Sequence, residues 1–170
     1  MTDDQAATAA SVLDQVEACA ADLVDHVVDT VRIPSVSGTD AENDAQAHMA
    51  RLFADGGLDV DHWRIDLDRL TADPEFPGME VERREAWGLV GRLAGAGDGR
   101  ALMLNGHIDV VPIGDPGAWT ATPFGGEIRA DDLYGRGSCD MKAGLLAAHW
   151  AVQAIRRAGV PLRGDVLVAS

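Results

Sequence analysis

Positively charged residues are scarce in this sequence of 170 residues. Lys142 is the only lysine, and 14 Lys and Arg stand against 28 Asp and Glu, which gives a formal net charge of -14. No run of basic residues interrupts the acidity. Since phosphate backbones and anionic lipids repel such a surface, we expect neither nucleic acid nor a membrane as a partner.

Cysteines and long apolar runs are also few. The two cysteines, Cys19 and Cys139, are too few for a disulfide framework. This scarcity favours a location in the reducing cytoplasm. No window approaches the roughly 18 apolar residues of a membrane span, and the acidic start does not resemble a signal peptide. The hydrophobic content of 46% predicts a globular protein. The length of 170 residues predicts a single domain.

Apolar residues recur at three- and four-residue spacing over 11–31, which predicts one amphipathic helix. Ser11 and Asp14 resemble a capping box at its start, and Pro34 predicts that it ends near Ile33.

Helices and strands alternate along the rest of the chain. We expect helices over 41–54 and about 145–157, strands over 58–65, 87–93, 101–104 and 165–169, a surface excursion over 66–85 and a hairpin over 127–134. This order predicts an α/β fold with a mixed, largely parallel sheet flanked by helices.

A first candidate site is the segment GHIDVVP at 106–112, directly after a predicted strand. If the chain stays extended, His107 and Asp109 project to one side and Ile108 and Val110 to the other. One side chain could then bind a metal while the other orients it. The alternative, a locally hydrogen-bonded turn, is favoured when this segment is considered alone.

A second candidate site is YGRGSCDMKAG at 134–144. Asp140 stands where a helix N-cap is expected, so capping is the structural alternative to a functional role. Lys142, the lone lysine among 13 arginines, indicates a need for a compact ammonium group. We expect Cys139 to be a packed small residue rather than a ligand.

The other candidates for chemistry have weaker support. His149 lies on an apolar helix face and is expected in the core, and His26, His48 and His62 have no partners at ligand spacing. Ser37 and Ser138 lack a G-x-S-x-G motif, and no phosphate-binding loop occurs.

Together, GHIDVVP, Trp119 with Phe124, and LYGRGSCDMKAG resemble the zinc-dependent aminoacylase and carboxypeptidase family that includes acetylornithine deacetylase and succinyl-diaminopimelate desuccinylase. The resemblance implies that His107 binds one metal ion, that Asp140 bridges two, and that Asp109 is the catalytic-site aspartate orienting His107. Zinc is the expected metal, with cobalt or manganese as alternatives. Lys142 and Arg136 would support the site, and Trp119 and Phe124 would line its wall or pack in the core.

The same resemblance implies that residues 1–170 are the N-terminal part of a catalytic domain. The family's general-base and ligand Glu pair is expected beyond Ser170, and its lid or dimerisation domain is absent, so the fragment alone is expected to be inactive. The longer protein would hydrolyse amides of small N-acyl amino acids, most like an acetylornithine deacetylase, and could form a homodimer. A dipeptidase or aminoacylase of the same family, or a non-catalytic α/β binding module, are the alternatives; the intact His107, Asp109 and Asp140 argue against the last.

Overall fold

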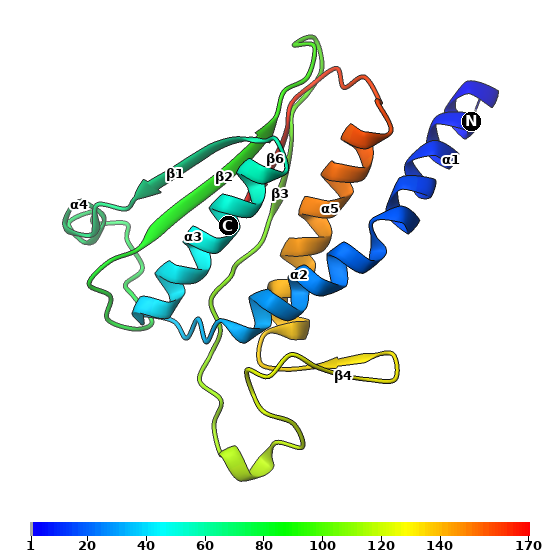
Figure 1. Cartoon of the computed structure of the whole chain (residues 1–170). Helices are drawn as coiled ribbons and strands as arrows, with labels where there is room; N and C mark the ends of the chain where they lie inside the picture. Colours follow the sequence, from blue (N-terminus) through cyan, green and yellow to red (C-terminus); the bar gives the residue numbers. More distant parts are fainter. Residues whose placement is uncertain (1) are drawn as a thin grey trace.

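A four-stranded sheet forms the centre of the computed structural model, which describes residues 2–170 (Figure 1). Its strand order is β1 (Asp59–Arg64), β2 (Trp87–Leu93), β6 (Val166–Ala169) and β3 (Leu102–Asn105). The predicted α/β fold with a mixed sheet is confirmed. Parallel pairing joins β3 to β6, whereas β1–β2 and β2–β6 are antiparallel. The sheet is therefore less parallel than the alternation of helices and strands predicts, because an antiparallel pair needs no crossover helix.

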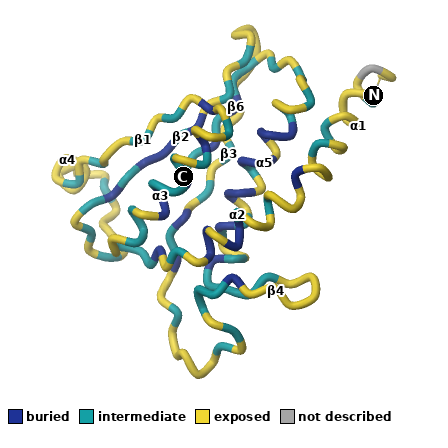
Figure 2. The backbone as a smooth tube through the Cα atoms, in the orientation of Figure 1, coloured by how far each residue is buried: buried dark blue, intermediate teal, exposed yellow. Residues whose placement is uncertain are grey.

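Three helices bury their apolar sides on this sheet and on each other. α3 (Asp40–Asp55) and α5 (Ala143–Arg157) cover one face, and α2 (Ala20–Arg32) lies beside α5 (Figure 1). Figure 2 shows the buried backbone concentrated between these elements. The largest fully buried apolar side chains are Phe53, Met49, Leu89, Ile108, Leu145 and Leu146. Each stabilises the fold by about 1.5–3 kcal/mol through burial.

The N-terminal region differs from the prediction. Instead of one helix over 11–31, the chain forms α1 (Asp3–Ala18) and α2, which are separated at Cys19. The capping box is formed by Thr2 and Gln5, not by Ser11 and Asp14. Cys19 is only 2% exposed and belongs to the core, so tertiary packing fixes the break. The predicted end before Pro34 is confirmed, since α2 stops at Arg32.

The remaining predicted elements are present. The excursion between β1 and β2 contains only a short helix, α4 (Leu67–Thr71), and the predicted hairpin consists of β4 (Glu127–Arg129) and β5 (Asp132–Tyr134). A short 3-10 turn spans Pro116–Ala118. Within residues 2–170, no helix has the length and apolar character that crossing a membrane requires.

Candidate active site

The segment that follows β3 is extended, as predicted. Ile108 and Val110 are 2% and 3% exposed, whereas His107 and Asp109 project to the other, open side. Residues 35–37 hold this segment in place. The Ser35 hydroxyl donates to the Ile108 carbonyl (2.8 Å), and the Ser35 backbone carbonyl accepts from the Val110 N–H (2.9 Å). The segment is thus fixed by a neighbouring stretch of chain rather than by a local turn alone.

The structure brings His107, Asp109 and Asp140 together. The His107 Nε2 atom lies 3.2 Å from Asp140 Oδ1, and its Nδ1 atom lies 3.2 Å from Asp109 Oδ1. Nδ1 is also 3.0 Å from the Asp109 carbonyl oxygen. The imidazole therefore lies between two carboxylates that come from different elements, and the Asp140 side chain is 87% exposed.

Asp140 is not a helix cap, so that alternative is wrong. It lies in the turn Ser138–Lys142, before α5 begins at Ala143, and its backbone is extended (φ -126°, ψ 100°). The peptide bond that follows it is cis. Gly137 opens this turn at φ +85°, and a Cβ atom there would lie 2.6 Å from Val110 Cγ1. The close approach of the turn to the 107–110 segment accounts for the glycine before Ser138.

Lys142 anchors the Asp140 turn to α2. Its side chain is fully buried, and Nζ donates to the carbonyl oxygens of Thr30 (2.9 Å) and Ile33 (2.7 Å). The carbonyls at a helix C-terminus lack partners within the helix, so an ammonium group is well placed there. Burial lowers the pKa of Lys142 to about 8. The role indicated for the only lysine is to position the turn.

Ser37 is a functional candidate that the sequence pattern did not identify. Its Oγ donates to Asp109 Oδ2 at 2.6 Å, while the other carboxylate oxygen of Asp109 faces His107. A hydroxyl, a carboxylate and an imidazole thus form a chain of contacts that fixes the ring orientation. Ser37 and Asp109 are 72 positions apart in the sequence, so no local signal predicts this contact.

Among the neighbouring side chains, Cys139 differs from the prediction. Cys139 is exposed rather than packed, and Cys19 is the buried cysteine. Trp119 is half-buried in a loop, where its Nε1 donates to the Ile113 carbonyl (2.8 Å) and the Arg136 guanidinium lies 5.0 Å from its ring centre. Phe124 is also half-buried. Neither aromatic residue belongs to the hydrophobic core cluster.

The prediction that His149 lies in the core is confirmed. His149 is 1% exposed and stacks on Phe53, with ring centres 5.1 Å apart. His48 contacts the Thr30 hydroxyl. Burial lowers the pKa of His48, and nearby Arg51 lowers it further.

The side chains brought together here are of the kinds that bind metal ions. His107 Nε2 and Asp140 Oδ1 lie 3.2 Å apart, and mixed imidazole and carboxylate donors suit zinc. In the described part of the chain, however, no group of three or more His, Cys, Asp or Glu side chains is arranged to hold an ion. A catalytic zinc usually takes three protein ligands, so these residues fit part of a metal site.

Comparison with known proteins supports the resemblance drawn from the motifs. Residues 103–170 match the model of Peptidase family M20/M25/M40. Succinyl-diaminopimelate desuccinylase 1 from Ruegeria sp. (strain TM1040) is 39% identical over 126 residues, 74% of this chain and 28% of its own length. The desuccinylase from Ruegeria pomeroyi is 43% identical over 93 residues, which are 55% of this chain and 23% of the relative's own length. The chain thus spans about a quarter of the length of the curated relatives it matches.

Solved structures share the fold. The M20 family metallo-carboxypeptidase Sso-CP2 from Sulfolobus solfataricus has a TM-score of 0.68 at 17% identity, over 86% of this chain and 30% of that one. The di-peptidase Dug1p from Saccharomyces cerevisiae has a TM-score of 0.70 at 19% identity, over 94% of this chain and 33% of the di-peptidase chain. Through residues 103–170, which carry His107, Asp109 and Asp140, the chain belongs to Peptidase family M20/M25/M40.

Proposed function

We propose that this chain is part of a metal-dependent hydrolase that cleaves the amide bond of a small N-acyl amino acid. One observation carries the proposal: the His107 imidazole lies between Asp140 and Asp109, at the carboxyl end of β3. Open α/β sheets bind their ligands at this end of their strands. Family membership supports the same chemistry.

Each of the three residues has a role in this proposal. His107 would hold one divalent ion, zinc in the first place, and Asp140 would be shared between this ion and a second one. Asp109 would accept the Nδ1 proton of His107, which leaves Nε2 free as a ligand, and Ser37 would hold Asp109 in place. The bound ions would polarise the amide carbonyl and lower the pKa of a water molecule toward neutrality.

The direction of β6 supports the proposal that further site residues follow Ser170. β6 runs parallel to β3, and Ala169 pairs with Asn105 in the last register position. In the same register, the residue after Ser170 would lie beside His107. We therefore propose that residues 1–170 are the N-terminal part of the catalytic domain, and that a Glu pair just beyond Ser170 supplies the general base and another ligand. The lid or dimerisation domain would lie elsewhere in the longer protein.

The names of the relatives favour a succinyl group as the acyl group that is removed. Both desuccinylases from Ruegeria are named for succinyl-diaminopimelate, whereas the motif resemblance alone favoured an acetylornithine deacetylase. An N-succinyl amino acid is therefore the first substrate to assay, and N-acetylornithine and a dipeptide are the next. A cytoplasmic location and a homodimer stay predictions.

Zinc binding and hydrolysis, measured in the protein extended past Ser170, test the proposal. Asp140→Asn and His107→Ala should each lose bound zinc and activity together. Asp131→Asn, which makes the same change at an exposed turn residue, should retain both. Full activity and normal zinc content in His107→Ala would rule out the assignment, and zinc binding without any amide hydrolysis would favour a binding module. Residues 1–170 alone should not hydrolyse amides.

The codons after Ser170 give an independent test. Two consecutive glutamates within about ten residues, the length of a short strand end and turn, are expected. Their absence would contradict the proposed general base.

A further inference from the structure

Three histidines lie where α2, α3 and α5 meet (Figure 1). His26 belongs to α2, His48 to α3 and His149 to α5. The His149 ring stacks on Phe53 of α3, with ring centres 5.1 Å apart, and the His26 ring stacks on Trp150 of α5 at 5.5 Å. Imidazole rings thus join α5 to both of the other helices.

The charged forms of His26 and His149 do not fit this junction. The Nδ1 atom of each ring is buried and has no hydrogen-bond partner in the described part of the chain. A protonated imidazole carries an N–H group on both nitrogens, so a charged ring would bury an N–H donor without an acceptor. Such a donor destabilises the packed state, because it has lost its hydrogen bond to water. The junction as folded therefore favours neutral rings.

His48 joins α3 directly to α2. Its Nε2 atom lies 3.3 Å from the Thr30 hydroxyl, which itself donates to the His26 carbonyl oxygen at 2.7 Å. A hydroxyl group has one proton to donate, so His48 Nε2 is the donor to Thr30. The Nδ1 atom of His48 is therefore the one that takes up a proton on acidification.

Charged groups of both signs surround the three rings. Those that line the cleft beside His26 and His149 are Asp22 of α2, Asp55 of α3, and Arg156 and Arg157 of α5. Those near His48 are His26 and Asp29 of α2, Arg51 of α3, and Lys142. The pKa values of His48 and His149 are nevertheless lowered, to about 4 for His149, and burial is the main cause. Proton uptake at these rings therefore opposes the packing of the helices.

α2 connects the junction to the candidate active site. The carbonyl oxygens of Thr30 and Ile33, at its C-terminal end, accept from Lys142 Nζ. Residues 35–37, which follow α2, hold the segment 107–110 in place. The main contacts of α2 are with its neighbouring helices and the turn before α5, not with the strands. It can therefore move without breaking the pairing of the four-stranded sheet.

We propose that the junction of α2, α3 and α5 is a pH-sensitive switch, in which proton uptake by His26, His48 and His149 at mildly acidic pH releases α2. The candidate active site then loses the contacts that residues 30–37 supply. Release of α2 does not depend on the metal-site assignment. The loss of activity that would follow in the longer protein rests on the proposed function.

Amide hydrogen exchange of the 170-residue chain, measured by mass spectrometry between pH 7.5 and 5, tests the proposal. Protection factors are corrected for the pH dependence of intrinsic exchange. Protection of α2 should fall about 30-fold, because His149 has a pKa of about 4 when packed and its ordinary 6.5 when released. At pH 5 it should be at least about tenfold below the protection of β2, which is lost only when the whole fold opens.

Two variants make the test specific. His149→Leu removes a titrating ring from the apolar face of α5 and should remove most of the fall in α2 protection. His62→Leu makes the same change in β1, where the ring packs on Trp87 outside the junction, and should leave the fall unchanged.

Equal protection of α2 and β2 at every pH would overturn the proposal, since α2 would then open only with the whole fold. It is also overturned if α2 protection does not change between pH 7.5 and 5, or if the two variants behave alike. The peptide that contains residues 33–37 should lose protection together with α2. If it stays protected, the junction does not act on the candidate active site and the switch is refuted.

Discussion

Acidification should destabilise the fold through His149. Burial holds the pKa of this histidine at about 4 instead of its ordinary 6.5, and the positive charges of His26, Arg156 and Arg157 contribute to the lowering. Above pH 6.5 the ring is neutral in both the folded and the unfolded chain. Between pH 6.5 and 4 the unfolded chain binds a proton that the folded chain does not, so the free energy of unfolding falls as the pH falls.

The magnitude follows from the two pKa values. Since one pKa unit corresponds to about 1.4 kcal/mol, the loss reaches about 3 kcal/mol at pH 4 and is complete just below it. Such a loss is a large part of the stability of a typical domain, which is about 5–15 kcal/mol. Protonation of carboxylates adds its own pH dependence, and a matched variant without the titrating ring is needed to remove it.

His149→Leu provides that comparison, because position 149 lies on the apolar face of α5 with Leu145 and Val152. Urea unfolding of both proteins at intervals from pH 7.5 to 4 gives the free energy of unfolding. The wild-type protein should lose about 3 kcal/mol more than the variant over this range. Equal losses in the two proteins would refute the reasoning, since they would show that His149 titrates alike in the folded and unfolded chains.

Three substitutions near the candidate active site give further predictions. Lys142→Met should lower the free energy of unfolding, measured in urea, by about 1–3 kcal/mol, because the two hydrogen bonds of Nζ are lost. The loss is partly offset because the variant no longer buries a charged ammonium group. An unchanged free energy would show that the anchor to α2 contributes nothing. Gly137→Ala should lower the Tm, because its φ is +85° and Val110 is too close; an unchanged Tm would contradict this. In the longer protein, Ser37→Ala should weaken zinc binding about 10–100-fold, whereas Ser11→Ala on the exposed side of α1 should not.

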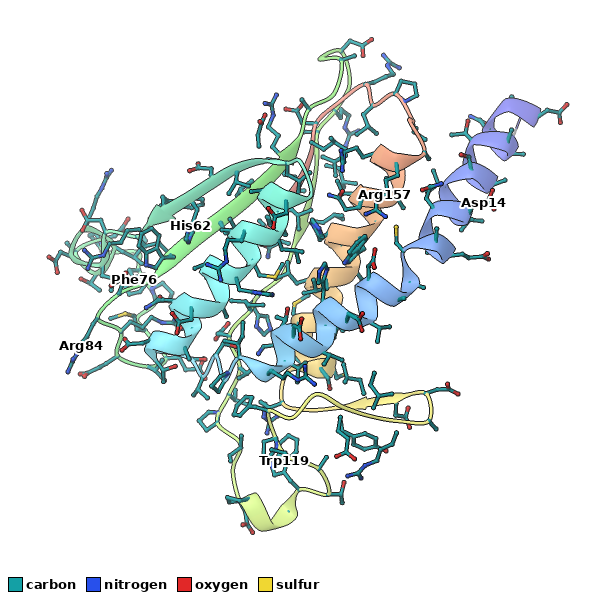
Figure 3. All side chains as sticks on the ribbon, in the orientation of Figure 1. Asp14, His62, Phe76, Arg84, Trp119 and Arg157 are labelled. Carbon is teal, nitrogen blue, oxygen red and sulfur yellow. The ribbon has the colours of Figure 1, made fainter. Side chains whose placement is uncertain are left out.

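Local signals predicted most of the secondary structure. Pro34 stops α2 and the pair at 56–57 ends α3, because the effects of proline and glycine on the backbone do not depend on distant residues. The break at Cys19 was not predictable, since apolar spacing continues through it. At the break, Cys19 packs in the core and accepts a hydrogen bond from Arg157, which is 138 residues away (Figure 3).

In the candidate site, too, features set by local sequence are predictable and features set by distant contacts are not. The shared side of His107 and Asp109 follows from alternation along an extended chain, which is a local property. The conformation of Asp140 and the acceptors of Lys142 depend on α2, more than 100 residues earlier. Likewise, the apolar spacing of α5 places His149 in the core but gives no sign that its ring stacks on Phe53 of α3.

The contacts from residues 30–37 also bear on which part of the chain can fold alone. Segment 103–170, which matches the family model, buries the Lys142 ammonium against carbonyls of α2 and pairs Val110 with Val36. Cut out by itself, this segment would leave a buried charge without acceptors and an unpaired backbone edge. The stretch of sequence by which the family is recognised is therefore shorter than its unit of cooperative folding, and a polypeptide trimmed to it should remain unfolded in solution.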